Sequence, residues 1–478
     1  MELLKPDLCI IGAGAGGLEV AAGAVAAGKA VVLIERDTVG GSRLKSVVPS
    51  KALVAAARMA HRIADADAFG LTVSRPELRF DQLRGYLDRV TSALAVDSAP
   101  ERFTGLGVRV ITGAAQFIGR RRLAVGDAIE VRAKCYVIAT GSLPVLPDIP
   151  GIDVPYLTDV PYLTDESIFT LAQLPAHLVV IGASVVGLEL AQAFRRLGAD
   201  VTVLDRGEPL AQEDPECVRV VLDALVREGV DIRTGVAIEA AAKTADGVQL
   251  TLGGGLGGGL GSVTGTHLLI ACGRRANVEG LGLDKAGVKV GPAGVVVNPA
   301  LRTSNRQIYA VGAVTGAPPF VHVARHHAAL VVRSAVLGLP ARLKPDAIPR
   351  LVVTDPELAH VGLTEAEAAQ RRIAVRVLRW PYSENDRARI EHAGRGHIKV
   401  LTSRWGRVLG ATIVGASAGE LIAPWSLAVG QGLDIRRLAG TLLPYPTLGD
   451  TGQRAAATYL TLAFRRTWAR RILGLLGR

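Results

Sequence analysis

The sequence of 478 residues predicts an α/β protein with two Rossmann-like dinucleotide-binding domains and a C-terminal α+β domain. Two βαβ openings carry this prediction. A strand at Asp7–Gly12 leads into the Gly-rich motif Gly12–Gly17, and a strand at His177–Gly182 leads into a second motif, Gly182–Gly187. One such motif is a weak signal, but two copies, each between a strand and a helix, are specific. A change of composition from Ile348 onwards marks the third domain.

An acidic residue closes the second strand of each βαβ unit. Glu35 ends the strand Ala30–Glu35 and Asp205 ends the strand Asp200–Asp205, at the same offset from the last glycine of each motif. The glycines let the backbone approach a pyrophosphate, the helix N-terminus supplies N–H donors, and the acid accepts from a ribose hydroxyl. We therefore predict nucleotide contacts at Gly12, Gly14, Gly17 and Glu35 in the first unit and at Gly182, Ser184, Gly187 and Asp205 in the second.

Two low-complexity stretches interrupt this pattern. A Pro-rich linker contains the hexapeptide V-P-Y-L-T-D twice in tandem, at Val154–Asp159 and Val160–Asp165. We interpret the repeat as a tolerated duplication in a surface connection. Gly253–Gly261 is rich in glycine and predicts an expanded hairpin tip or a disordered loop.

Net charge, the N-terminal residues and the cysteines indicate the class of partner, the location and the sulfur chemistry to expect. The net charge of +11 indicates either attraction to an anionic partner or a high-Arg composition that aids solubility. Asp7 already opens the first strand, so we expect no signal peptide and a cytoplasmic protein. Cys9, Cys135 and Cys272 lie in apolar runs and are expected to be inert core thiols, and no cysteine has metal-ligand spacing. Neither a metal site nor a nucleic-acid partner is predicted.

Further motifs follow the two Gly-rich ones in a fixed order: Ala139–Gly141, Ala271–Asn277, Tyr309–Gly312, Thr354–Glu357 and Pro446–Thr447. With Gly40–Lys51, whose ends read Gly-Gly and Pro-Ser-Lys, they resemble the class I pyridine nucleotide-disulfide oxidoreductases. That family includes lipoamide dehydrogenase, glutathione reductase and mercuric reductase. The resemblance runs from about residue 5 to residue 465.

The resemblance implies FAD in the first unit, a nicotinamide cofactor in the second, and a homodimer. It implies domains at 1–152 and 278–346 (FAD-binding and central), 153–277 (NAD-binding) and 347–478 (dimerisation). It places a lysine beside the flavin and a paired glutamate where hydride crosses, here Lys51 and Glu189. The implied FAD contacts are Gly12, Gly14, Gly17, Glu35, Gly41, Lys51, Thr140, Gly141, Gly312 and Ala313, and the implied NAD contacts are Gly182, Ser184, Gly187, Glu189, Asp205 and Gly273.

The sequence departs from the family in its sulfur chemistry. The family has two cysteines between the Gly-Gly and the Pro-Ser-Lys, whereas Gly40–Lys51 has none and is one residue shorter. Tyr445 stands before Pro446–Thr447, where the family has the histidine base. Disulfide exchange needs a thiolate, and a tyrosine with a reference pKa near 10 is a poor base for thiols.

Two further positions concern the cofactors. Ala313 replaces the family's aspartate that bonds the FAD ribityl chain, so FAD binding is expected to be weakened but retained. Asp205 favours NADH because an acid accepts from the 2′-hydroxyl and repels a 2′-phosphate, whereas Arg206 could accept that phosphate. We expect NADH, with NADPH as the alternative.

From these departures the sequence predicts an FAD-dependent NAD(P)H oxidoreductase that passes electrons from flavin directly to a small acceptor such as a quinone, without a dithiol relay. Lys51, Glu189 and Tyr445 are the predicted catalytic residues. One alternative is a soluble NAD(P) transhydrogenase. Another is a catalytically degenerate nucleotide-binding scaffold or sensor, which Ala313 favours. A dihydrolipoyl dehydrogenase-type disulfide reductase is the least favoured reading.

The C-terminal tail has its own pattern. After Asp450 there is no acidic residue, and Leu460, Phe464, Trp468 and later apolar residues recur every four positions among arginines. This predicts a basic amphipathic helix. The helix either contacts the anionic inner face of the membrane or packs on its own dimer.

Overall fold

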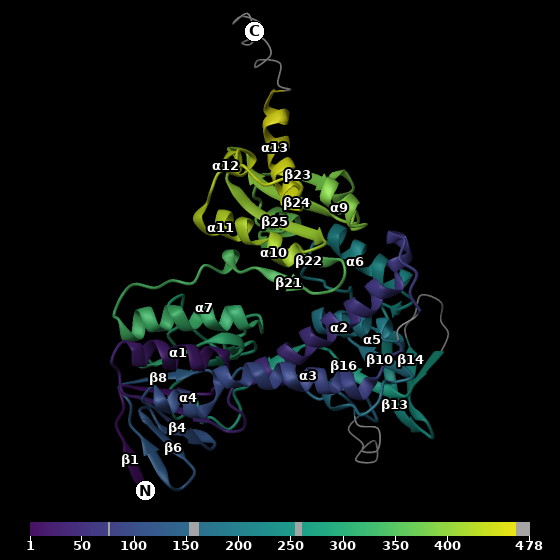
Figure 1. The fold of residues 1–478 in the computed structure, drawn as a ribbon. Coiled ribbons are helices and arrows are strands. Elements are labelled where there is room, and N and C mark those ends of the chain that lie inside the picture. Colours follow the sequence, from purple (N-terminus) through teal and green to yellow (C-terminus); the bar gives the residue numbers. More distant parts are fainter. Residues whose placement is uncertain (75–76, 153–161, 254–260, 465–478) are drawn as a thin grey trace, which may run out of the picture. The chain divides into compact units, whose positions relative to one another are not determined.

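The computed structural model describes residues 1–74, 77–152, 162–253 and 261–464 (Figure 1). They form two compact units. The first holds Met1–Ala56, Ser74–Leu174 and His267–Leu343, and the second holds Ala57–Val73, Pro175–Thr266 and Lys344–Arg478. Most of the tandem repeat, the tip of the Gly-rich stretch and the predicted tail helix beyond Phe464 lie outside the described residues.

A five-stranded parallel sheet is the centre of the first unit. Its strands are near-continuous apolar runs because both faces of the sheet are covered. In β2, Leu8 and Ile10 belong to one core cluster with helices α1 and α7, whereas Cys9 and Ile11 belong to the cluster under a second, smaller sheet. The order is β20-β8-β2-β3-β4, which span Ile308–Ala310, Cys135–Ile138, Leu8–Ile11, Val31–Glu35 and Val108–Thr112.

Helices α1 (Ala15–Ala26) and α7 (Val321–Val331) lie side by side on one face of this sheet (Figure 1). Small residues permit this close approach, because a Cβ added at Gly16 would lie 3.1 Å from Val311 and 3.4 Å from the Ala324 oxygen. The smaller sheet covers the opposite face. Its order is β1-β7-β6-β5, which span Glu2–Leu4, Ile129–Val131, Arg122–Val125 and Ala115–Gly119.

The cysteine-free segment Gly40–Lys51 is largely helical. A π-helical turn, η1 (Arg43–Val47), continues directly into α2 (Val48–Ala64). Lys51 therefore lies in the first turn of a regular helix. Helix α3 (Phe80–Ala95) packs against η1 within the first unit.

The second unit repeats the βαβ pattern. Strands β10 (His177–Ile181), β11 (Asp200–Leu204) and β12 (Asp231–Arg233) run parallel, with α5 (Val185–Arg196) and α6 (Pro215–Arg227) beside them. An antiparallel sheet follows, β13 (Ala237–Thr244), β14 (Gly247–Gly253) and β15 (Gly261–Gly265), in which β14 pairs with both β13 and β15.

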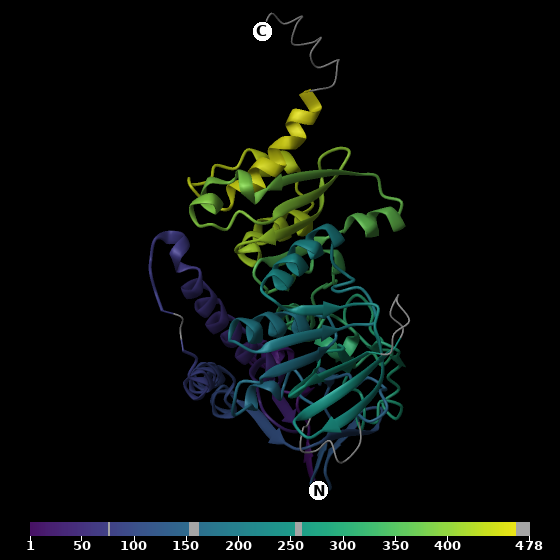
Figure 2. The ribbon, with the colours of Figure 1, turned by 90° about the vertical axis from the view of Figure 1, so that its right-hand side faces the viewer.

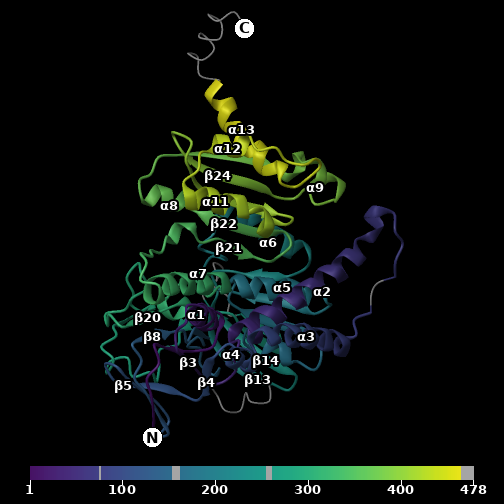
Figure 3. The same ribbon diagram turned by 60° about the vertical axis from the view of Figure 1, so that its left-hand side comes forward.

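The last part of the second unit is an antiparallel sheet covered by helices, the α+β architecture expected from the sequence (Figure 2). Helix α13 (Asp450–Phe464) lies beside β24 of this sheet (Figure 3) and also contacts β23. Its residues Ala455 and Tyr459 join the core cluster. Among the described residues, no helix combines the length and apolar character that a bilayer crossing requires. The strand order is β21-β22-β25-β24-β23, which span Arg350–Val352, Glu357–Gly362, Val408–Gly415, His397–Ser403 and Val375–Pro381.

Candidate nucleotide-binding and redox site

The first Gly-rich motif leaves an open helix N-terminus. Gly12 has φ +102°, and a Cβ there would lie 2.5 Å from the Ala139 oxygen; a Cβ at Gly17 would lie 1.9 Å from the Gly12 oxygen. A Cβ at Gly14 would meet nothing within 4 Å, and no side chain caps α1 at this residue. The unsatisfied N–H groups of the first turn of α1 therefore suit a pyrophosphate.

Glu35 and Gly41 lie against the same turn. The Glu35 carboxylate accepts from the backbone N–H of Ala13 (2.6 Å) and of Asp37 (3.0 Å). A Cβ at Gly41 would lie 3.1 Å from the Gly14 Cα. The structure thus brings together five of the residues predicted to contact FAD, and the carboxylate is fixed at the end of β3 where a ribose hydroxyl is expected.

Thr140 and Gly141 are held by the segment that carries Gly273. The Thr140 hydroxyl donates to the Asn277 oxygen (2.7 Å), and the Asn277 N–H donates to the Gly141 oxygen (3.0 Å). Gly273 (φ +104°) lies in the first unit with these residues, and its oxygen accepts from the N–H of Val145. Its assignment to NAD stays a prediction.

Sequence reasoning missed His327, which is buried and contacts the backbone of Gly312. Its Nδ1 accepts from the Gly312 N–H (3.2 Å), so Nε2 carries the proton of the neutral ring. Nε2 is buried and has no hydrogen-bond partner within the described residues. The side chain is only 1% exposed, and burial, together with neighbouring His326, lowers the pKa of His327 to about 4. Two adjacent histidines in a mainly apolar helix were the only sequence signal.

His327 should make the protein acid-sensitive. Below its ordinary pKa of 6.5 the unfolded chain takes up a proton that the folded protein does not, so stability falls as the pH drops from 6.5 towards 4. His327→Asn keeps an oxygen that can accept from Gly312 and should remove up to about 3 kcal/mol of that loss. Urea unfolding of both proteins at pH 7.5 and pH 4.5 measures the difference. Parallel pH profiles would contradict it.

The second motif reproduces the first with one change. Gly182 has φ +108°, and the Asp205 carboxylate accepts from the N–H of Ala183 (2.6 Å) and of Gly207 (2.8 Å), as Glu35 does in its own unit. Ser184 caps α5 by accepting from the Gly187 N–H (3.2 Å). The four predicted nucleotide residues of this motif are therefore gathered at one strand-to-helix turn.

The predicted catalytic residues are divided between the units. Lys51 belongs to the first unit, and Glu189 and Tyr445 belong to the second. Glu189 is buried and one of its oxygens accepts from the Val353 N–H (2.7 Å). Tyr445 is 76% exposed and donates to Asp386 (3.0 Å); this bond and the Asp386 charge raise the pKa of Tyr445. Its catalytic role stays a prediction. Because its pKa is raised, even less of Tyr445 is deprotonated at neutral pH and able to act as a base.

Three of the four cysteines offer no thiolate in place of the missing pair. Cys9 and Cys217 are buried, and burial raises the pKa of both thiols; burial also raises the pKa of Cys135 to about 12. Cys272 corrects the sequence prediction: it is exposed, because β16 (His267–Ile270) ends before it. Within the described residues, no cluster of three His, Cys, Asp or Glu side chains could hold a metal ion.

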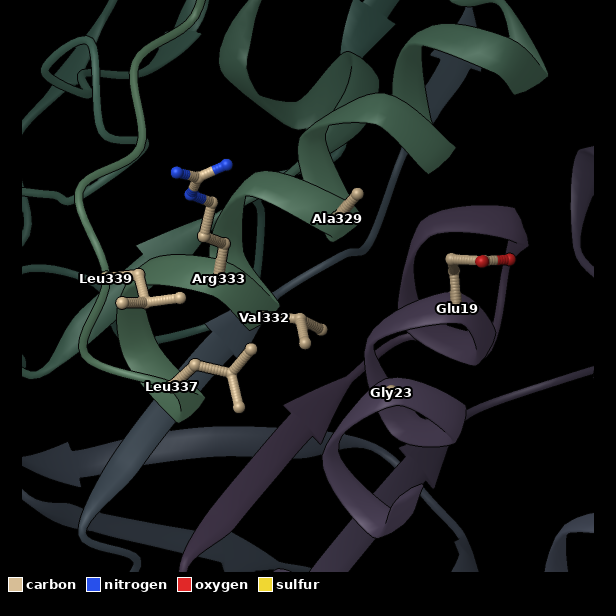
Figure 4. Close-up of a pocket in the computed structure, with 7 residues that line it drawn as sticks. All are labelled: Glu19, Gly23, Ala329, Val332, Arg333, Leu337 and Leu339. Carbon is tan, nitrogen blue, oxygen red and sulfur yellow. The ribbon is translucent and has the colours of Figure 1, made fainter. Parts of the chain in front are cut away.

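A surface pocket of about 480 Å³ lies between α1 and η7 (Val332–Val336), the turn that follows α7 (Figure 4). None of the predicted nucleotide residues lines it. Its lining residues are Glu19, Gly23, Ala329, Val332, Arg333, Leu337 and Leu339.

Comparison with known families agrees with this geometry. The model of the pyridine nucleotide-disulphide oxidoreductase family matches residues 6–328, and that of its dimerisation domain matches residues 348–456. The chain belongs to this family. Its members are FAD-dependent oxidoreductases that use a pyridine nucleotide, and the dimerisation domain supports a homodimer. The predicted family and fold class are thereby confirmed.

Named relatives cover almost the whole chain. Mercuric reductase of Streptomyces lividans is 37% identical over 462 residues, covering 95% of this chain and 96% of the relative. Dihydrolipoyl dehydrogenase 3 of Pseudomonas aeruginosa is 35% identical, covering 94% and 97%. Among solved structures, LpdA of Mycobacterium tuberculosis has a TM-score of 0.85 at 27% identity, covering 95% of this chain and 99% of its own.

The Cu(II) complex of an HOCl-induced flavoprotein disulfide reductase from Escherichia coli has a TM-score of 0.82 at 26% identity, covering 96% of this chain and 100% of its own. These relatives and neighbours contradict the predicted function: they point to disulfide reductase activity and not to direct reduction of a quinone without a dithiol. That prediction was wrong because it weighed one short segment, Gly40–Lys51, above a likeness that extends over nearly the whole chain.

Proposed function

We propose that the protein is an FAD-dependent NAD(P)H oxidoreductase of the disulfide reductase type. Its substrate would belong to the class for which the relatives are named: a disulfide, a dithiol, or a mercuric ion held by thiols. The observation that carries this proposal is the likeness over about 95% of the chain to mercuric reductase and dihydrolipoyl dehydrogenase. The two nucleotide turns at Gly12–Gly17 and Gly182–Gly187 support it, because each presents backbone donors and a fixed carboxylate.

The residues of the chain fit both cofactors. The N-terminus of α1 would hold the FAD pyrophosphate, with Glu35 on the ribose, and the turn at Gly182–Gly187 would hold the nicotinamide nucleotide. When bound, these groups supply hydride transfer from reduced nicotinamide to flavin. Lys51 would place a positive charge beside the flavin, which stabilises its reduced form, and Glu189 would carry the matching negative charge.

An anaerobic titration tests this proposal. The FAD-loaded dimer is titrated with NADH while the flavin spectrum is recorded, and then receives lipoamide, glutathione disulfide or mercuric ion with excess thiol. Gly40–Lys51 contains no cysteine, so the protein supplies no sulfur there. Each of these three additions therefore brings its own sulfur. We expect NADH to bleach the flavin and at least one sulfur substrate to restore its colour. A flavin that NADH does not reduce, or that none of the three reoxidises, would contradict the function.

Lys51→Met tests the role of Lys51 in the first step, the reduction of the flavin by NADH. Loss of the charge beside the flavin should slow bleaching by NADH at least tenfold, a barrier increase of about 1.4 kcal/mol. Lys45→Met removes a lysine from the same segment and serves as the control, because no role beside the flavin is proposed for it. Equal rates in both variants would remove Lys51 from the site.

We propose NADH as the preferred donor. Asp205 supports this choice because its carboxylate is already fixed by the N–H groups of Ala183 and Gly207, where it would accept from a 2′-hydroxyl and repel a 2′-phosphate. Asp205→Ser should therefore lower the ratio of kcat/KM for NADH to that for NADPH by about 10- to 100-fold. An unchanged ratio would show that another residue selects the donor.

We also propose that the C-terminal tail contacts an anionic membrane surface. The support is its composition, since residues 465–478 contain five arginines and no acid. At the described end of the chain, Arg454 already pairs with Asp450 and is not part of this charge. A chain ending at Phe464 should lose sedimentation with phosphatidylserine vesicles while the dimer remains intact. Unchanged sedimentation would indicate that the tail packs on the protein.

A further inference from the structure

A buried hydrogen bond holds the cysteine-free segment Gly40–Lys51 against the rest of the first unit. The Ser46 hydroxyl, in the π-helical turn η1, donates to the Asp165 carboxylate at 2.9 Å. Ser46 is 6% exposed and Asp165 is 8% exposed, so water does not compete for either group. A hydrogen bond to a buried carboxylate is charge-assisted and is among the stronger kinds in proteins.

The same carboxylate is paired with an arginine whose side chain is 12% exposed. Arg274 approaches the Asp165 oxygen that accepts from Ser46 at 2.5 Å, and it also contacts Glu166 at 2.6 Å. Its remaining donors reach Ser142, at 3.0 Å to the hydroxyl and 2.8 Å to the backbone oxygen. Asp165 therefore keeps its arginine partner and its orientation without Ser46, and the serine adds a specific link from η1 to a cluster that is already in place.

This cluster joins two segments that lead to residues predicted to contact FAD. Arg274 begins β17 (Arg274–Ala276), which pairs with β9 (Ser142–Pro144) directly after Thr140 and Gly141. Ser46 lies five residues before Lys51 on a continuous helical stretch. All of these residues belong to the first unit. One carboxylate thus connects the helical turn that leads to Lys51 with the strand pair that follows Thr140–Gly141.

We propose that Asp165 is a positioning residue, which holds Gly40–Lys51 in its helical conformation through Ser46 and so fixes Lys51 for hydride transfer. In this chain no disulfide can cross-link the segment, because it contains no cysteine. The Ser46–Asp165 bond supplies a non-covalent restraint at the same turn. A second bond, from Arg43 to the Ser98 hydroxyl (3.0 Å), restrains the start of the turn. The part about Lys51 rests on the proposed function, and the restraint itself does not.

Limited proteolysis tests the restraint without using activity. Trypsin cleaves after Arg43 and Lys45, and both bonds lie within η1, so cleavage requires the turn to open. When opening and closing are fast, the cleavage rate follows the population of the open form. Ser46→Ala should raise this rate about tenfold, since it removes one charge-assisted bond and leaves the Asp165–Arg274 pair intact. Cleavage products are identified by mass spectrometry.

Ser167→Ala is the matched control. Ser167 lies two residues after Asp165 and accepts from the Thr164 N–H (2.9 Å), so the variant also loses one local hydrogen bond. We expect wild-type cleavage from Ser167→Ala. Urea unfolding should show both variants to be folded under the conditions of digestion, with Ser46→Ala losing about the 1.4 kcal/mol that a tenfold rise in opening corresponds to. Equal acceleration by the two variants, or no acceleration by Ser46→Ala, would overturn the proposal. Asp165→Asn is a further variant, and its failure to fold would leave the serine comparison valid.

A spectroscopic readout separates positioning from stability. With FAD bound, Ser46→Ala should slow bleaching of the flavin by NADH at least threefold, whereas Ser167→Ala should match wild type. If proteolysis shows the restraint but bleaching is unchanged, Asp165 does not position Lys51 and that part is overturned. If wild-type flavin is not reduced at all, the proposed function fails, while the proteolysis result still decides the restraint.

Discussion

Gly17→Ala should destabilise the first unit even without cofactor, whereas Gly14→Ala should leave the unit folded and abolish its retention of FAD. A methyl group at Gly17 would lie 1.9 Å from the Gly12 oxygen, and this backbone contact cannot be relieved by rotating a side chain. We expect a loss of about 3 kcal/mol in unfolding free energy, at the upper end of overpacking costs. Gly14 has an ordinary φ of −77° and open space in front of it, so an alanine there strains nothing in the protein. Its methyl group would instead take the space proposed for the FAD pyrophosphate.

The two variants separate the structural role of the motif from its binding role. Urea unfolding of the FAD-free protein measures the first, and flavin absorbance after gel filtration measures the second. Gly28→Ala is the control for adding a methyl group near the end of α1, where nothing lies within 4 Å and only the positive φ of +72° is strained. If Gly14→Ala retained FAD as well as wild type, the pyrophosphate would not approach this helix as closely as proposed.

The parts of the site that the sequence predicted are local in the chain. Each motif lies between a strand and a helix, and the acid at the end of the next strand returns to the same turn because β2 pairs with β3 and β10 pairs with β11. Glu35 and Asp205 consequently make the same pair of backbone hydrogen bonds. A pattern of glycines, apolar runs and one acid is sufficient to predict this geometry.

The parts that the sequence could not predict depend on distant contacts. Ser46 and Asp165 are 119 residues apart, and Asp165 and Arg274 are 109 apart, with no periodicity to indicate their meeting. His327 carries a neutral ring because the fold buries it against the backbone of Gly312. Cys272 was misplaced for a related reason: an apolar run does not show where a strand ends. The function was misjudged because loss of one motif says little about the substrate of the remaining protein.

Lys399→Met should cost the second unit about 3–5 kcal/mol of unfolding free energy, the range for breaking a buried ion pair. Lys399 contacts Asp214 at 2.7 Å, Glu365 at 2.7 Å and Glu216 at 3.2 Å, and its side chain is 4% exposed. Burial acts against its charge, but the hydrogen bonds and charges of the carboxylates outweigh burial and raise the pKa of Lys399. Removing the ammonium leaves the Asp214 carboxylate, 2% exposed, without its cation.

A double variant decides whether that unpaired charge causes the loss. Asp214 also caps α6 by accepting from the Glu216 N–H (3.0 Å), and an asparagine can keep this cap because its oxygen accepts in the same way. Asp214→Asn combined with Lys399→Met should therefore recover much of the stability lost in Lys399→Met alone. Arg379→Met is the control, since it breaks an ion pair to Glu216 that is 44% and 41% exposed and should cost less than about 1 kcal/mol. No recovery in the double variant would mean that packing of the lysine stem, and not its charge, ties α6 to the sheet.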